Sequence, residues 1–195
     1  MKSAIAVSVL AALATSVLAD DQPFTMAVAN SSNPSLVGKS IEASGGHLVL
    51  GGAPSVGCYS DDRADACAKE NRTVFDFDTS SGVIVLDHYG TSVQYVQILS
   101  DATLIYSPAH TNTYEGSITS FEYTPASSAS STGTLGLKDD KVQNTMSNGF
   151  DACQVNDIFI LVANNPTNKL ATSGPCFHVA ISTSDSSPSN AFQYN

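Results

Sequence analysis

Residues 73–86 read TVFDFDTSSGVIVL, and this stretch decides the fold class. Apolar and polar side chains alternate within Thr73–Asp78, which is the period-two pattern of a strand with one buried face. Ser81-Gly82 is a turn signal, and the apolar run Val83–Leu86 follows it directly. The stretch therefore predicts two antiparallel strands joined by a tight turn.

The same pattern continues outward in both directions along the chain. A second hairpin is expected from Val93–Leu99 and Thr103–Tyr106, which the polar stretch Ser100-Asp101-Ala102 separates. One helical turn is expected within Asp62–Glu70, and the low-complexity stretch Pro125–Thr132 (PASSASST) predicts a long loop. Further strands are expected at residues 24–29, 39–43, 47–50, 117–123, 134–137, 158–163 and 177–182.

About ten short strands of this kind indicate an all-β chain. Gly, Pro, Asn and Ser separate the strands, while the strong helix formers Glu, Lys and Arg are few. Such a series predicts a single-domain β-sandwich or flattened barrel of antiparallel strands. We expect this domain to span residues 20–195, with a polar tail from about residue 183.

The first nineteen residues have the composition of a secretory signal peptide. The sequence MKSAIAVSVLAALATSVLA has a lysine at position 2, then an apolar stretch, and it ends in Val17-Leu18-Ala19, which fits a cleavage site between small residues. It is shorter and richer in alanine than a membrane-spanning helix, which needs about 20 strongly apolar residues. We therefore expect residues 1–19 to be removed and the protein to be secreted, either into the medium or to the cell wall.

The acidic balance of the chain narrows the classes of partner. Its 18 Asp and Glu oppose 8 Lys and Arg, which gives a formal charge of −10. Such a surface repels phosphate backbones and anionic lipids, so we expect neither nucleic acid nor a membrane as a partner. The polar end SDSSPSNAFQYN lacks the apolar tail of a GPI signal, so we expect no GPI anchor.

Four cysteines follow the leader, at Cys58, Cys67, Cys153 and Cys176. An even number in a secreted chain implies two disulfides, and the sequence leaves three pairings open. We favour Cys58–Cys67 and Cys153–Cys176, because each pair brackets a compact polar segment, and closing a loop of this size contributes about 3 kcal/mol. The spacings do not match the closely spaced ligand pairs of a zinc site.

Two sequons predict N-glycosylation in a secreted chain, at Asn30-Ser31-Ser32 and at Asn71-Arg72-Thr73. Each is expected to mark a surface loop or a strand edge that carries a glycan. Asn71 is the stronger candidate, because it follows the first cysteine loop and precedes a strand.

Candidate catalytic groups are few, and the sequence has no nucleophile elbow, zinc-protease motif or phosphate-binding glycine loop. Asp76 and Asp78 share one face of a strand at about 6.6–7 Å, a separation that would suit an inverting glycosidase. Asp87 beside His88 is a second acid–base candidate for a hydrolase, although neighbours on a strand face opposite sides. Exposed acids on a polar strand face explain these residues more simply, so we expect no enzyme.

One metal question stays open, at the first cysteine loop. Asp61, Asp62 and Asp65 crowd this loop, where they could ligate calcium or pair with Arg63. Elsewhere no metal-ligand spacing is present, and we expect neither a metal nor a cofactor. The other three histidines are His47, His110 and His178. We expect a structural role for His110, and we expect His178 to face solvent or the opposite face of the sheet.

An alternative function is a carbohydrate- or small-ligand-binding module that acts as a secreted effector. The chain has no Trp, so stacking on sugar rings would rely on tyrosine. The alternative requires that several tyrosines line one concave patch. The candidates are Tyr59, Tyr89, Tyr95, Tyr106, Tyr114 and Tyr123.

A resemblance to a known family is carried by the four cysteines and by five stretches in their order along the chain. The stretches are Ile41–Gly52 (IEASGGHLVLGG), Asn71-Arg72-Thr73, Gln94–His110, Phe150–Cys153 and Ile158–Ala163. Together they resemble the PhiA-type secreted cell-wall proteins of fungi, a family also known as IgE-binding proteins. The resemblance covers most of residues 24–182. The chain departs from the pattern in its acidic stretch CYSDDRADAC and in Asp151-Ala152, where the family often has an aromatic residue.

The resemblance implies a non-catalytic protein of the fungal cell wall or medium, linked in some fungi to the development of conidium-bearing cells and to allergenicity. It transfers the four cysteines and Asn71 to this chain and supplies no catalytic residue. The partners to expect are cell-wall polysaccharides or other wall proteins.

Overall fold

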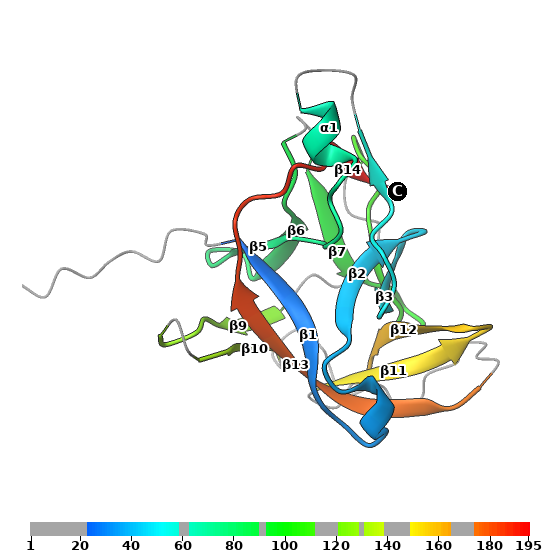
Figure 1. The fold of residues 1–195 in the computed structure, drawn as a ribbon. Helices are drawn as coiled ribbons and strands as arrows, with labels where there is room; N and C mark the ends of the chain where they lie inside the picture. The colour runs from blue at the N-terminus through cyan, green and yellow to red at the C-terminus, as the bar shows by residue number, and fades with distance from the viewer. Residues whose placement is uncertain are drawn as a thin grey trace, which may run out of the picture.

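Seven segments of the chain are described by the computed structural model in Figure 1: residues 23–58, 63–89, 93–111, 121–128, 131–138, 149–164 and 174–195. The expected signal peptide, residues 1–19, lies outside them. Within the described residues strands dominate, and helix is limited to η1 (Pro34–Leu36) and α1 (Ala64–Cys67). The predicted all-β fold class is confirmed.

Twelve strands form one antiparallel sheet, in the order β2-β1-β5-β6-β7-β8-β3-β12-β11-β13-β10-β9. Their bounds are β1 (Phe24–Ser31), β2 (Ser40–Ser44), β3 (His47–Leu50), β5 (Phe75–Asp78), β6 (Val83–Leu86), β7 (Gln94–Ile98), β8 (Leu104–Tyr106), β9 (Phe121–Thr124), β10 (Gly133–Leu137), β11 (Phe150–Val155), β12 (Ile158–Ala163) and β13 (Cys176–Asp185). Two short strands, β4 (Val56–Gly57) and β14 (Gln193–Tyr194), pair separately.

The large sheet folds back on itself, because three of its strands, β1, β3 and β13, have three partners each, and β13 pairs with β1, β10 and β11. β1 pairs with β2, β5 and β13, and β3 pairs with β2, β8 and β12. The strands β1, β2, β3, β12, β11 and β13 therefore form a closed ring of hydrogen-bonded neighbours. The pairing of β1 with β13 runs from Phe24 opposite Asp185 to Ser31 opposite Val179, with a register shift between Val28 and Asn30.

Both hairpins expected from the sequence are present. β5 pairs with β6 in the register Phe75 opposite Leu86, and Gly82 makes the turn with a positive φ of 71°. β7 pairs with β8, and Ala102 adopts a φ of 71° in the turn between them. Ala102 is fully buried, so its packing holds a conformation that alanine disfavours. The described residues of the expected loop Pro125–Thr132, which are 125–128 and 131–132, lie between β9 and β10 outside any strand. Residues 117–120 of the expected strand lie outside the described segments.

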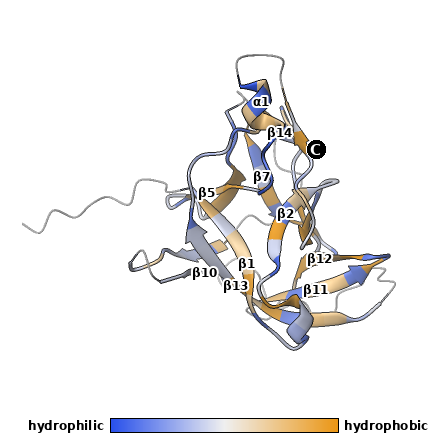
Figure 2. Ribbon diagram, viewed as in Figure 1, coloured by the Kyte–Doolittle hydropathy of each residue, from blue (hydrophilic) through white to orange (hydrophobic). Residues whose placement is uncertain are grey.

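The core follows from side chains that alternate along the strands. On β1, Phe24, Met26 and Val28 are buried in the main cluster, while Thr25 and Ala27 are half-buried on the other face. β12 is apolar along its length (Figure 2), and its last four residues, 160–163, are buried on both faces of the sheet. Leu161 and Ala163 join the main cluster, and the alternate residues Ile160 and Val162 pack with Val49 and Cys153 in a smaller cluster.

The two ends of the molecule are built differently. One end carries α1, β4 and β14, and the other carries the hairpin of β11 and β12 with the start of β13 (Figure 1). The single turn α1 lies within the helical segment expected from the sequence. None of the described helices is long and apolar enough to cross a membrane.

The polar tail expected from residue 183 is part of the folded structure. β13 continues to Asp185, and the following residues return to the interior, where Ala191 and Tyr194 are buried. The two residues of β14 pair with β4, with Tyr194 opposite Val56. We call residues 186–195 the C-terminal strap.

Candidate functional site

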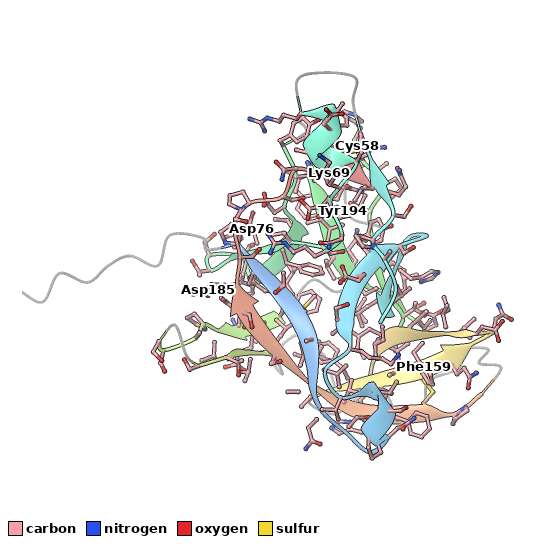
Figure 3. All side chains as sticks on the ribbon, viewed as in Figure 1. Cys58, Lys69, Asp76, Phe159, Asp185 and Tyr194 are labelled. Carbon is pink, nitrogen blue, oxygen red and sulfur yellow. A yellow bond between two sulfur atoms is a disulfide. The ribbon has the colours of Figure 1, made fainter. Side chains whose placement is uncertain are left out.

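Both disulfides have the predicted pairing, and all four cysteines take part in them. Cys153 and Cys176 lie directly opposite each other on β11 and β13, so this bridge reinforces the sheet itself. Cys58 and Cys67 join the chain after β4 to α1, at the end of the molecule that carries the strap (Figure 3). The cysteines are therefore structural.

The candidate hydrolase residues are occupied in separate structural roles. The two carboxylate oxygens of Asp78 accept hydrogen bonds from the backbone and hydroxyl groups of Ser80 and Ser81, which caps the turn after β5. These hydrogen bonds lower the pKa of Asp78 to about 2. Asp87 instead accepts a hydrogen bond of 2.6 Å from the amide of Ser189 in the strap. No hydrogen bond or ion pair among the described residues brings Asp78 and Asp87 to one site.

Asp76 and His88 complete the set of hydrolase candidates. Asp76 lies on β5 between the buried residues Phe75 and Phe77 and is half-buried. His88 follows Asp87 after the end of β6 and is also half-buried. The fold therefore uses the acids of this region mainly to hold turns and the strap in place, and the non-catalytic interpretation stays a prediction.

The calcium question falls partly outside the described residues, because Asp61 and Asp62 lie there. Asp65 is on α1 and exposed. The guanidinium of Arg63 lies 4.8 Å from the centre of the Tyr89 ring, a cation–π contact, and the ion pair that the sequence suggested for Arg63 stays a prediction. Among the described residues no group of three His, Cys, Asp or Glu side chains is placed to hold a metal.

The four described tyrosines among the candidates do not line a common patch. Tyr106 is buried, and its hydroxyl donates to the carbonyl of Asn195. Tyr123 stacks on Phe24 with ring centres 4.7 Å apart, as part of the core wall. Tyr89 contacts the ring of Phe192 in the strap edge-on. Tyr95 is half-buried on β7. Tyr59 and Tyr114 lie outside the described residues. A tyrosine platform for sugars therefore finds no support in these four positions.

The two sequons lie in different environments. Asn30 and Ser32 are exposed at the end of β1. Asn71 is exposed before β5, but the sequon residue Thr73 is only 1% exposed and its hydroxyl accepts a 2.7 Å hydrogen bond from the amide of Ala43. Both asparagine side chains can carry a glycan without displacing the core, and glycosylation stays a prediction.

A buried polar network that the sequence did not predict holds the C-terminal strap. The side chain of Gln94 is fully buried on β7. Its amide donates to the carbonyls of Ser107 and Tyr194, and its oxygen accepts a 2.7 Å hydrogen bond from the amide of Tyr194. One side chain thus pairs with both backbone groups of a residue 100 positions away.

The ring and hydroxyl of Tyr194 extend this network into the core, where the side chain is buried, toward the end of the molecule that carries α1 (Figure 3). The hydroxyl accepts a hydrogen bond from the amide of Val74 and shares another with the hydroxyl of Ser189. Burial raises the pKa of Tyr194 to about 12, because ionisation in this place would be unfavourable. Glu42 lies close by and accepts from the amide of Thr73, and burial raises its pKa as well.

A second polar cluster lies on the outer face of the sheet, where β13 pairs with β11. His178 lies opposite Asp151, and its Nδ1 is 3.2 Å from Asp151 Oδ1. Asn164 donates to the same carboxylate oxygen at 3.1 Å. We call His178, Asp151 and Asn164 the His178 cluster.

The imidazole of His178 is held in place although its side chain is 60% exposed. A Cβ added at Gly149 would come within 2.8 Å of the ring carbon Cε1, so only glycine fits there without a shift. Because Nδ1 is taken by Asp151, Nε2 is left without a partner among the described residues. A hollow of about 370 Å³ adjoins the ring, lined by Asn30, Ser31, Ser32, His178 and Ala180.

The sequence did not predict this cluster, because its members lie on three separate segments. His178 was expected to face solvent or the opposite face of the sheet, and Asp151 stood out only as a departure from the family pattern. The period-two alternation of Phe177-His178-Val179 does place His178 on the outer face. The register that brings Asp151 opposite His178 has no local signal.

Comparisons with family models, with curated proteins and with solved structures give no match for this chain. The resemblance to PhiA-type proteins therefore stays an expectation from the sequence.

Proposed function

We propose that this chain is a secreted, non-catalytic protein of a fungal cell wall or its surroundings, with a structural or binding role. The observation that carries the proposal is the pairing of all four cysteines in two disulfides, since such bridges persist mainly in oxidising compartments outside the cytosol. A signal-peptide composition in residues 1–19 supports the same location.

Two further observations favour a passive role over catalysis. Asp78 and Asp87, which a hydrolase would need as reacting groups, accept hydrogen bonds that hold a turn and the strap. The acidic, hydroxyl-rich composition suits a protein that stays soluble among neutral polysaccharides. Cell-wall polysaccharides or other wall proteins are the partners that we propose, and the link to conidium-bearing cells rests on the family resemblance alone.

The location is tested by expressing the full chain with its own leader in a filamentous fungus and separating medium, wall and cell contents. We expect the protein in the medium or the wall, without residues 1–19 and without free thiols. Retention inside the cell with the leader attached and with reactive thiols would contradict the proposal.

The role is tested by incubating the secreted protein with insoluble chitin, β-glucan and mannan. Retention of the native protein on one polymer, and loss of retention after reduction and unfolding, would identify a binding role. Presence in the wall without retention on any of the three polymers would favour attachment through other wall proteins.

A further inference from the structure

Asn30 lies beside the hollow that the exposed imidazole of His178 borders. Asn30 is exposed on β1, just after the register shift that follows Val28. Its partner on β13 is Ala180, whose small side chain leaves the surface beside Asn30 open. The hollow of about 370 Å³ lies within the roughly 300–1,000 Å³ range of small-molecule sites.

The polar groups around this hollow suit a sugar. Ser31 and Ser32 supply hydroxyl groups, and that of Ser31 keeps its proton to donate while its oxygen accepts from the amide of Asn33. Nε2 of His178 supplies one further polar atom. The contacts with Asp151 and Gly149 fix the ring, so little side-chain freedom is lost when a ligand binds. The lining carries no acidic side chain of its own, which favours a neutral ligand.

We propose that the hollow is the seat of the first N-acetylglucosamine of a glycan on Asn30, with His178 as its hydrogen-bonding partner. This inference rests on the proposed export, because the glycan is added in the secretory pathway. In that step the amide nitrogen of Asn30 loses a proton to solvent and bonds to C1 of the sugar, and the lipid diphosphate that carried the oligosaccharide leaves. The covalent link then keeps the sugar at a high effective concentration beside the hollow.

The second sequon provides an internal comparison. The hydroxyl of Thr73 is withdrawn into a hydrogen bond with Ala43, whereas Ser32 stays at the surface. None of the three hollows described in the structure has Asn71 in its lining. We therefore expect a glycan on Asn71 to extend into solvent, while the first sugar on Asn30 is ordered against the sheet.

The experiment uses the full chain secreted by a fungal host as the N71Q variant, so that Asn30 is the only sequon left. One sample is trimmed by an endoglycosidase that leaves a single N-acetylglucosamine, and N30Q, which loses the sequon but keeps the Ser32 hydroxyl, is the unglycosylated control. We expect the single-sugar form to show shifted NMR signals of the His178 ring, assigned with H178Q. We also expect it to melt about 2–4 °C above N30Q.

Three outcomes decide between the inference and the proposed function. Secreted protein with an unmodified Asn30 would overturn the inference alone, as would ring signals of His178 that coincide in the single-sugar form and in N30Q. Failure of export, with both asparagines bare in the wild-type chain, would contradict the proposed function as well. N30D, which matches the product of complete enzymatic deglycosylation, separates the effect of a new charge from the effect of the sugar.

Discussion

Gln94 shows how much of this fold depends on single buried polar residues. Its side chain makes three hydrogen bonds, two of them to the backbone of Tyr194, in a place without contact to water. A polar group buried in this way stabilises only while its partners stay satisfied, and the loss of one partner leaves the others unpaired. The side chain of Gln94 therefore joins β7 to the strap through these hydrogen bonds, and we call this connection the Gln94 clasp.

The Q94A variant tests this clasp. It leaves the amide and carbonyl of Tyr194 unsatisfied, and we expect it to lower the free energy of unfolding by about 2–3 kcal/mol. Urea denaturation followed by circular dichroism measures the loss. Q193A, on the neighbouring half-buried residue of β14, is the matched control and should change the free energy by less than about 0.5 kcal/mol. Equal effects of the two variants would contradict the role of Gln94.

Asp78 gives the turn after β5 a defined pH dependence. Its pKa is lowered from 3.8 to about 2, so the ionised carboxylate is favoured in the folded state. A depressed pKa of this kind contributes stability above pH 3.8, and the contribution is lost as the pH falls towards 2. We expect D78N to melt below the wild type at pH 6 and the difference to close between pH 4 and about 2.

A melting series from pH 7 to pH 2 measures this difference. D157N is the control. Asp157 is exposed in the turn between β11 and β12, and no described hydrogen bond from a neighbouring serine holds its carboxylate as in Asp78. A gap between D78N and the wild type that stays constant down to pH 2 would mean that the serine hydrogen bonds do not favour the charged form.

At the scale of elements, the two disulfides do different work. Cys153–Cys176 joins residues that the ladder of β11 and β13 already places opposite each other, so it strengthens existing pairing. Cys58–Cys67 instead ties α1 to the chain after β4, where regular pairing is limited to two residues on each strand. The region of α1 and β4 therefore depends on the Cys58–Cys67 bridge for its local order more than the ladder of β11 and β13 depends on Cys153–Cys176.

Removal of each bridge should show this difference. C153A/C176A and C58A/C67A each remove a short closed loop, and chain-entropy reasoning gives a loss of about 3 kcal/mol for either. Hydrogen exchange separates the two variants. We expect C58A/C67A to speed hydrogen exchange locally in α1, β4 and β14. For C153A/C176A we expect all protected amides to lose protection in step with the global stability, so that their order of exchange is unchanged. A uniform loss of protection in both variants would contradict the interpretation that Cys58–Cys67 maintains local order and Cys153–Cys176 strengthens existing strand pairing.

The whole molecule is closed twice, once by strand pairing and once by the strap. The ring of β1, β2, β3, β12, β11 and β13 encloses much of the main cluster. The strap then binds back through Asp87, Glu70 and Gln94, whose side chains accept hydrogen bonds from three of its backbone amides. Because the strap buries Tyr194 in the shared core, it belongs to the same cooperative unit as the sheet.

Substitution of Tyr194 tests this unity. Y194F removes the hydroxyl that pairs with Val74 and Ser189, and we expect a loss of about 1–2 kcal/mol in one cooperative transition. We also expect the amides of Ser189 and Tyr194 to exchange as slowly as those of β1. Fast exchange in the strap beside a protected sheet would show that the strap opens independently.

Much of this architecture could be predicted from local patterns. The alternation in residues 73–78 predicted β5, and Ser81-Gly82 predicted its turn. Cysteine count and spacing led to the correct pairing. β11 was missed, because Phe150–Val155 lacks strict alternation and Cys153 interrupts it. The His178 cluster and the strap network were missed because their partners are far apart in sequence, up to 120 residues in the case of Glu70 and Asn190.

The amino-acid sequence alone determined the all-β class, the hairpins and the two bridges, because strand faces, turns and loop closure are encoded within short windows. Only the tertiary structure decided that a polar C-terminal segment returns to bury Ala191 and Tyr194 and that His178 meets Asp151 beside Asn30. The physical reason is register: which residues face one another across strands depends on how the whole sheet closes, and a shift of one residue would send every side chain to the other face.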